Sequence, residues 1–158
     1  MTETDLYTFI TQSKLGVLGT VSESGAPQSA LVGIGVTEKL EIVFDTVKSS
    51  RKYRNLIARP ECSFSIGWAG EKTVQYEGVA EELAGGEHQK NYFEAYFKAW
   101  PDGPARLSWP GIVHFVVRPK WIRYSDYDQR PPLIQEFKFD CKTPTLTGGA
   151  GIGCKAPG

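Results

Sequence analysis

The segment from Phe44 to Lys52 combines residue types that could hold an anion. It reads Phe-Asp-Thr-Val-Lys-Ser-Ser-Arg-Lys, so two hydroxyls are followed directly by a guanidinium and an ammonium. The apolar run before it predicts a strand, and the residues after it predict a helix that begins near Ser50. The first turn of a helix has free N–H groups and the positive end of the helix dipole. Arg51 and Lys52 at that turn therefore predict a phosphate site and a phosphorylated small molecule as its ligand.

The alternative is an ordinary helix start, in which Ser49 or Ser50 caps the helix and the two basic side chains are simply exposed. Cations are disfavoured at this end of a helix, by a few tenths of a kcal/mol to about 1 kcal/mol, because they face the positive end of the dipole. A bound anion would relieve that mismatch. The residue types alone leave both interpretations open.

Composition excludes several classes of protein. The chain has 158 residues, with 41% hydrophobic residues and 18 acidic against 18 basic side chains, which predicts one domain that needs no metal or disulfide. A neutral chain with a pI near 6.7 is a poor candidate for binding nucleic acid or anionic membranes. The acidic N-terminus and the absence of a long apolar stretch favour a cytoplasmic protein.

The three cysteines have no metal-type spacing. Cys62, Cys141 and Cys154 are odd in number and unrelated in spacing, so we expect reduced thiols and no metal site. A disulfide between Cys141 and Cys154 stays open as an alternative. The last residues, 142–158, are rich in Gly, Thr and Pro and are predicted to form a flexible tail after a single domain over 1–141.

The hydrophobic pattern predicts the elements that must position the candidate site. It indicates helices over 6–13, 50–60 and 88–100. It indicates antiparallel strands over 15–21, 28–36, 40–44, 62–68, 73–83, 112–118 and 121–127, with Pro119 between the last two and a loop over 101–110. Short antiparallel strands with inserted helices predict a mainly β fold, a closed or partly closed β-barrel with flanking helices.

Three segments resemble a known family by their order and spacing. They are Gly19-Thr-Val-Ser-Glu-Ser-Gly-Ala-Pro27, Ser49-Ser-Arg-Lys-Tyr-Arg-Asn-Leu56 and Arg118-Pro-Lys-Trp-Ile-Arg-Tyr-Ser125. Together they resemble the FMN-binding split barrels of the pyridoxamine 5'-phosphate oxidase-like family, over roughly residues 5–127. The resemblance implies FMN as cofactor and a homodimer with FMN at the subunit interface.

The resemblance also implies roles for particular residues. Arg51 and Lys52 would hold the FMN phosphate, with Ser49 and Ser50 in the same loop, and Thr46 would contact the flavin. Gln75 would contact the polar edge of the ring. The backbone of the second strand would lie along the ring, at Ala30, Leu31 and Val32. Among the four tryptophans, Trp109 is the candidate for stacking on the flavin.

Two departures limit what the resemblance implies about the reaction. The oxidase proper has an arginine where this chain has Ala30, and its C-terminal Arg-x-His-Asp segment has no counterpart here. The sequence therefore favours an FMN-dependent oxidoreductase of unknown substrate and electron donor, without an identified catalytic residue. The alternatives are a noncatalytic flavin-binding or sensor protein, or a haem or deazaflavin binder. Haem would need an axial ligand from His88 or His114, for which structural roles are favoured.

Overall fold

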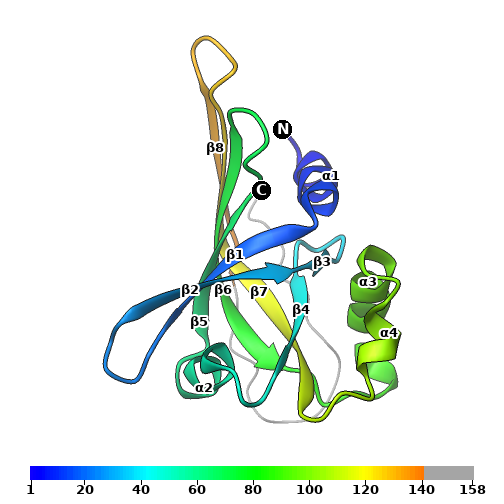
Figure 1. The fold of residues 1–158 in the computed structure, drawn as a ribbon. Helices are drawn as coiled ribbons and strands as arrows, with labels where there is room; N and C mark the ends of the chain where they lie inside the picture. Colours follow the sequence, from blue (N-terminus) through cyan, green and yellow to red (C-terminus); the bar gives the residue numbers. More distant parts are fainter. Residues whose placement is uncertain (141–158) are drawn as a thin grey trace.

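The computed structural model describes residues 1–140, which form one curled antiparallel sheet with helices at its sides (Figure 1). The strand order is β2-β1-β5-β6-β7-β4-β3, and β8 pairs with β7. The strands are β1 (Leu15–Val21), β2 (Pro27–Gly33), β3 (Gly35–Val36), β4 (Ile42–Val47), β5 (Glu61–Ile66), β6 (Lys72–Glu82), β7 (Ile112–Asp126) and β8 (Leu133–Lys138). The helices are α1 (Glu3–Ser13), α2 (Arg51–Ala58), α3 (Lys90–Ala99) and α4 (Gly103–Arg106), with a 3₁₀ turn over Glu87–Gln89. The prediction of a mainly antiparallel β fold with flanking helices is confirmed.

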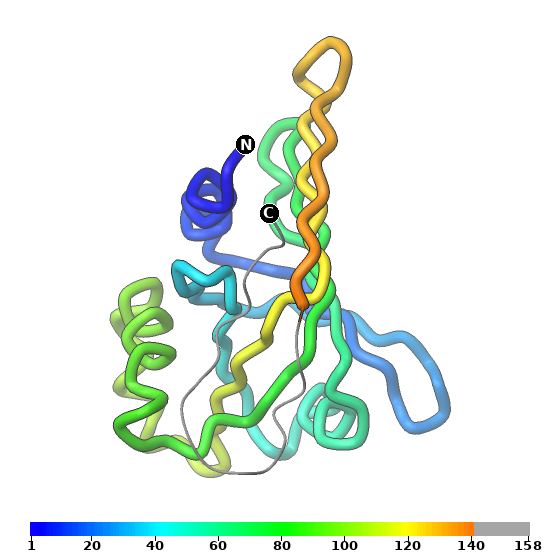
Figure 2. The backbone as a smooth tube through the Cα atoms, turned by 180° about the vertical axis from the view of Figure 1, so that it is seen from behind, coloured from blue at the N-terminus to red at the C-terminus, as the bar shows by residue number. Residues whose placement is uncertain are grey.

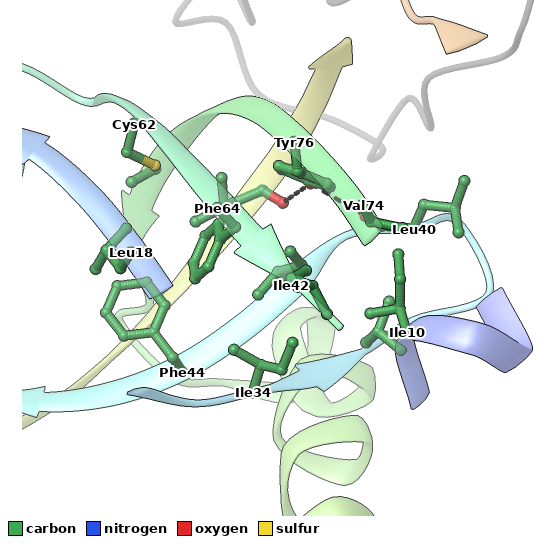
Figure 3. Close-up of a cluster of buried hydrophobic side chains, with 14 of the residues drawn as sticks. Ile10, Leu18, Ile34, Leu40, Ile42, Phe44, Cys62, Phe64, Val74 and Tyr76 are labelled. Carbon is green, nitrogen blue, oxygen red and sulfur yellow. Dashed lines mark hydrogen bonds between the residues drawn. The ribbon is translucent and has the colours of Figure 1, made fainter. Parts of the chain in front are cut away.

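Alternating side chains build the main core on the inner face of the curled sheet. In β5, Cys62, Phe64 and Ile66 are buried while Ser63 and Ser65 are exposed, as a strand with one solvated face requires. Figure 3 shows side chains from β1, β4, β5, β6 and α1 meeting in this core. The buried hydroxyl of Tyr76 lies 3.0 Å from the carbonyl oxygen of Leu40 and 2.8 Å from that of Val117, so it links two separate parts of the chain.

A second, smaller core lies on the other side of β4 and β7. Val43 and Val116 point away from the main core and are covered by α3, through Tyr96 and its aromatic neighbours. Figures 1 and 2 show α3 and α4 together on one side of the sheet, whereas the β1–β2 hairpin projects on the opposite side with α2 beside its base. The sheet therefore has one part covered by helices and one part, β1–β2–β5–β6, whose outer face carries exposed side chains.

Pro119 does not separate two strands, so that prediction is wrong: β7 runs without a break from Ile112 to Asp126. The pairing with β6 shifts between Glu77 and Gly78, so Glu77 faces Trp121 and Gly78 faces Pro119. Lys120 is thus the extra residue of a β-bulge. Proline has no N–H to give to a ladder, and a bulge is the position where a strand tolerates that loss.

Other boundaries also differ from the prediction. The second strand ends at Gly33 and β3 is a separate short strand, while β4 begins at Ile42 and continues to Val47. A short helix, α4, occupies part of the loop expected over 101–110, and β8 was not predicted. The predicted tail and the possible Cys141–Cys154 pairing lie outside the described residues.

Candidate functional site

The turn between β4 and α2 is held by hydrogen bonds within the turn and by one to the start of β7. The N-cap residue of α2 is Ser50, whose Oγ accepts a hydrogen bond from the backbone N–H of Tyr53 at 3.2 Å. The same Oγ lies 3.0 Å from Oγ1 of Thr46 on β4. The backbone N–H of Lys48 donates to the carbonyl of Gly111 at 2.9 Å, which ties the turn to the start of β7. The turn that carries the candidate phosphate residues is therefore fixed on both sides.

The first turn of α2 carries two cations and no acid. Arg51 and Lys52 form no ion pair with any described residue, and the first turn of this helix holds no acidic residue. Arg51 is exposed and Lys52 is half-buried. Elsewhere in the described chain, Arg106 and Arg118 are each bonded to carboxylates. The positive end of α2 is thus left uncompensated, which is the electrostatic condition for binding an anion.

A pocket of about 180 Å³, here called the α2 pocket, lies between this helix and the β1–β2 hairpin. Its lining residues are Leu18, Thr20, Gln28, Ser29, Ala30, Arg51 and Lys52. The two cations therefore share a pocket with Ala30, one of the residues predicted to lie along the flavin ring. The volume suits a phosphoryl group and part of its attached chain, since pockets for whole drug-sized ligands are larger.

A second pocket of about 320 Å³, here called the outer pocket, lies across β1, β5 and β6. Its lining combines small residues with larger ones. The lining residues are Val17, Gly19, Ser29, Ser63, Phe64, Ser65, Gln75, Tyr76, Glu77 and Trp121. A Cβ on Gly19 would lie 2.5 Å from Oγ of Ser63, so a side chain at this position would displace the Ser63 hydroxyl that lines the pocket.

The two pockets lie on opposite faces of the sheet. Leu18 is buried on the inner face of β1, whereas Val17 and Gly19 point outward because successive side chains of a strand alternate. Gln75 is exposed between buried Val74 and Tyr76, so it also points outward. Gln75 and the Arg51–Lys52 pair of one chain therefore line different pockets, and Ser29 of the edge strand β2 borders both.

The other predicted residues lie around these pockets. Thr46 is buried beneath Ser50, and Ser49 is exposed in the turn. On β2, Leu31 is 60% exposed whereas Val32 is buried. Trp109 is 54% exposed in the segment between α4 and β7 and lines neither pocket.

The histidines differ in their surroundings. His114 lies on β7 within 6.0 Å of the rings of Phe93, Tyr96 and Phe97, and its Nε2 has no hydrogen-bond partner. Burial lowers the pKa of His114, partly opposed by the nearby carboxylate of Asp45. His88 is exposed within the 3₁₀ turn.

Cys62 is the one cysteine within the described residues. It is buried in the main core, and this burial raises the pKa of its thiol to about 12. The thiol is thus protonated at neutral pH and inert as a nucleophile.

Residues that the sequence analysis did not single out also border the site. Gln28 and Thr20 line the α2 pocket, and the buried Asn55 on α2 bonds both of them. Asn55 follows Arg51 by four residues, a spacing that places both on one side of a helix. That spacing was the sequence signal that could have pointed to Asn55. Its hydrogen-bond partners could not be predicted, because they lie 35 and 27 residues away in the chain.

The curled antiparallel sheet and the cations at the start of α2 define a split-barrel protein. Residues 3–126 match the sequence profile of the family described as pyridoxamine 5'-phosphate oxidase. The chain belongs to this family. A pyridoxine/pyridoxamine 5'-phosphate oxidase of Bordetella avium is 33% identical over 125 residues, which cover 73% of this chain and 57% of that protein. The chain thus spans little more than half the length of this relative.

Solved structures with low sequence identity share the fold. A haem-binding protein of Mycobacterium smegmatis is 20% identical with a TM-score of 0.73, covering 87% of this chain and 58% of the other. A pyridoxamine 5'-phosphate oxidase-related, FMN-binding protein of Nostoc punctiforme is 12% identical with a TM-score of 0.66, covering 87% of both chains. These likenesses establish the architecture. Separately, none of the helices within residues 1–140 has the length and apolarity needed to cross a membrane.

Proposed function

We propose that this protein is a homodimeric FMN-dependent oxidoreductase that acts on a small molecule. The observation that carries the proposal is the Arg51–Lys52 pair, unpaired with any described acid, at the first turn of α2 and in the α2 pocket. Two adjacent cations and free helix N–H groups fit the dianionic phosphate of FMN. Family membership and the FMN-binding neighbour support flavin as the cofactor.

The residues of this chain would hold and orient the cofactor. Arg51 and Lys52 would bind the phosphate, with the hydroxyls of Ser49 and Ser50 beside them. Thr46 shares a hydrogen bond with Ser50, so it fixes the hydroxyl at the start of the helix. When bound, the flavin supplies hydride transfer, and the protein supplies anchoring, orientation and control of access.

The opposite placement of the two pockets favours a site built from two copies of the chain. Gln75, the residue predicted to contact the ring, lies on the outer face, away from the Arg51–Lys52 pair of its own chain. The outer face also exposes Leu31 and Val21. In a dimer packed through this face, Gln75 would serve the flavin anchored by the other copy.

The first test is the cofactor itself. Purified protein is expected to be yellow, to release FMN on denaturation, and to bind added FMN when stripped. A colourless protein that binds no added FMN, or a preparation with a haem Soret band that FMN cannot replace, contradicts the proposal. Oxidation of NADH or NADPH in the presence of candidate acceptors separates an enzyme from a flavin-binding sensor.

The second test addresses the shared site. A heterodimer of an Arg51→Ala copy and a Gln75→Ala copy is expected to keep one site of wild-type affinity, since both changes fall in the other site. Differently tagged, co-expressed copies allow its purification, and the two variant homodimers are the controls. If both residues of one chain serve the same flavin, neither site of the heterodimer has wild-type affinity.

A further inference from the structure

Two amide side chains meet beside the α2 pocket: Gln28 lines it, and Asn55 bonds Gln28 from α2. Nδ2 of Asn55 lies 2.9 Å from Oγ1 of Thr20 on β1 and 2.9 Å from Oε1 of Gln28 on β2. Asn55 and Thr20 are only 7% and 5% exposed. A buried amide that lost these partners would be left with unsatisfied donors, so the bonds fix the side chains strongly.

In this network the oxygen end of Gln28 is the end engaged by Asn55. Its Oε1 is engaged by Asn55, and Gln28 lines the same pocket as Arg51 and Lys52. Within residues 1–140 its Nε2 has no hydrogen-bond partner. That N–H₂ group is therefore left as a donor for a bound molecule. Ala30, the next residue on the same face of β2, has no side-chain polar atom to compete with it.

The same network connects Gln28 to the helix that carries the two cations. Asn55 follows Arg51 by four residues and Lys52 by three, so the three side chains share one side of α2. Thr20 and Gln28 face each other across the β1–β2 ladder. One amide thus joins the helix that carries the cations to both strands of the hairpin.

We propose that Gln28 is a third ligand of the anion held by Arg51 and Lys52, and that Asn55 is the positioning residue that orients it. This inference rests on the proposed function for the identity of the anion, the phosphate of FMN. Gln28 gives a neutral donor to a phosphoryl oxygen, and the bond from Asn55 keeps that donor turned toward the pocket.

The comparison of FMN with riboflavin isolates a contact to the phosphate, because the two differ only in that group. Gln28→Met keeps the length of the side chain and removes its amide. We expect this variant to bind FMN about ten- to 150-fold more weakly, the range for one lost hydrogen bond to a charged group, with riboflavin affinity within about twofold of wild type. Gln12→Met, at an exposed position of α1, is the matched control and should change neither affinity. Equal losses for FMN and riboflavin, or no loss, would overturn the role of Gln28.

A double-mutant cycle tests the positioning role of Asn55. Asn55→Leu is expected to weaken FMN binding by a factor similar to that of Gln28→Met, and to add less than about twofold in the Gln28→Met background. A purely structural role would instead give the same loss in both backgrounds. If Asn55→Leu does not fold, Asn55→Ser takes its place in the cycle.

A titration with inorganic phosphate separates this inference from the flavin assignment. The amide resonances of Arg51 and Lys52 are followed by NMR as phosphate is added to wild type and to Gln28→Met. A wild type that binds phosphate but not FMN rejects the flavin proposal and still tests Gln28, since the variant should bind phosphate several-fold more weakly. Equal phosphate affinities in the two proteins contradict the inference.

Discussion

The cations on the two sides of this sheet have opposite surroundings. On the side covered by α3 and α4, Arg106 donates to Asp45 at 2.8 Å and also bonds Asp102 and the hydroxyl of Tyr96. On the α2 side, Arg51 and Lys52 have no acidic partner among the described residues. The first set satisfies its charges within the chain and stabilises the fold. The second set leaves its charge unpaired within the described residues, which costs some stability and is the basis of the proposed anion site.

The sharpest test of this contrast removes both unpaired cations. The Arg51→Ala, Lys52→Ala variant should lose about 4 kcal/mol of FMN binding free energy, from two charge-assisted contacts of roughly 2 kcal/mol each. Its stability without ligand should stay the same or rise slightly, because the mismatch with the helix dipole is gone. Isothermal titration and thermal melts measure the two quantities. The control is Arg54→Ala, which removes an exposed cation two residues after Lys52 on the same helix. An equal loss of FMN affinity in this variant would contradict the special role of Arg51 and Lys52.

The converse change removes a paired cation. Arg106→Met keeps the length of the side chain but leaves the carboxylate of Asp45 without its partner, which should cost about 2–3 kcal/mol of unfolding free energy. FMN affinity should change by less than about twofold. Denaturant unfolding and FMN titration separate the effects. A variant that unfolds like wild type but binds FMN poorly would reverse the roles assigned to the two sides.

Acid should lower the free energy of unfolding through His114, which lies on the α3 side of the sheet. Burial lowers the pKa of this imidazole, while Asp45 from β4 opposes the shift and Arg106 from α4 adds to it. The folded protein therefore takes up the proton less readily than the unfolded chain. The stabilising effect of the neutral imidazole is complete above the unfolded pKa near 6.5 and falls as the pH drops below it, by at most about 1.4 kcal/mol per pH unit.

Urea unfolding between pH 7.5 and 5 measures this slope. His114→Phe, which places a ring among the rings of α3, should have a shallower slope over that range. His88→Phe, at an exposed position, should keep the wild-type slope. If His114→Phe retains the full slope, the acid sensitivity comes from other groups.

The smallest expected effect concerns Ser50, which belongs to both the fold and the site. Ser50→Ala removes the cap of α2 and the contact with Thr46, and should cost about 1 kcal/mol of stability. Ser49→Ala, one residue earlier and exposed, should cost little. Thermal unfolding of the two variants compares them directly, and equal melting temperatures would show that the cap adds nothing.

Local patterns predicted most of the elements, and they failed where a distant residue decides the structure. The start of α2 follows from its own residues, because Ser50 caps the helix that it precedes. The exposed side of Gln75 follows from alternation within one strand. The separation of Gln75 from Arg51 could not be predicted, since it depends on which strands are neighbours and how the sheet curls.

Pro119 illustrates the same limit. A proline within an apolar run predicts a break, because a proline cannot donate to a neighbouring strand. The break is absent because Gly78 on β6 meets Pro119, and a Cβ at Gly78 would lie 2.5 Å from the carbonyl oxygen of Arg118. The accommodation of the proline is therefore a property of a pair of residues 41 positions apart (119 − 78), which neither segment reveals alone.

The hydroxyl of Tyr76 has two alternative acceptors, whereas each N–H group in a ladder of backbone hydrogen bonds has one. One proton lies within reach of two carbonyl oxygens, those of Leu40 and Val117 (Figure 3 draws a hydrogen bond of Tyr76 as a dashed line). A hydroxyl rotates about its C–O bond, so its hydrogen can point to either acceptor without any heavy atom moving far. A small displacement of the turn before β4 relative to the middle of β7 would thus leave one of the two bonds in place. The main core of this split barrel is therefore joined at the turn before β4 and at β7 by a hydroxyl group that can rotate between two acceptors.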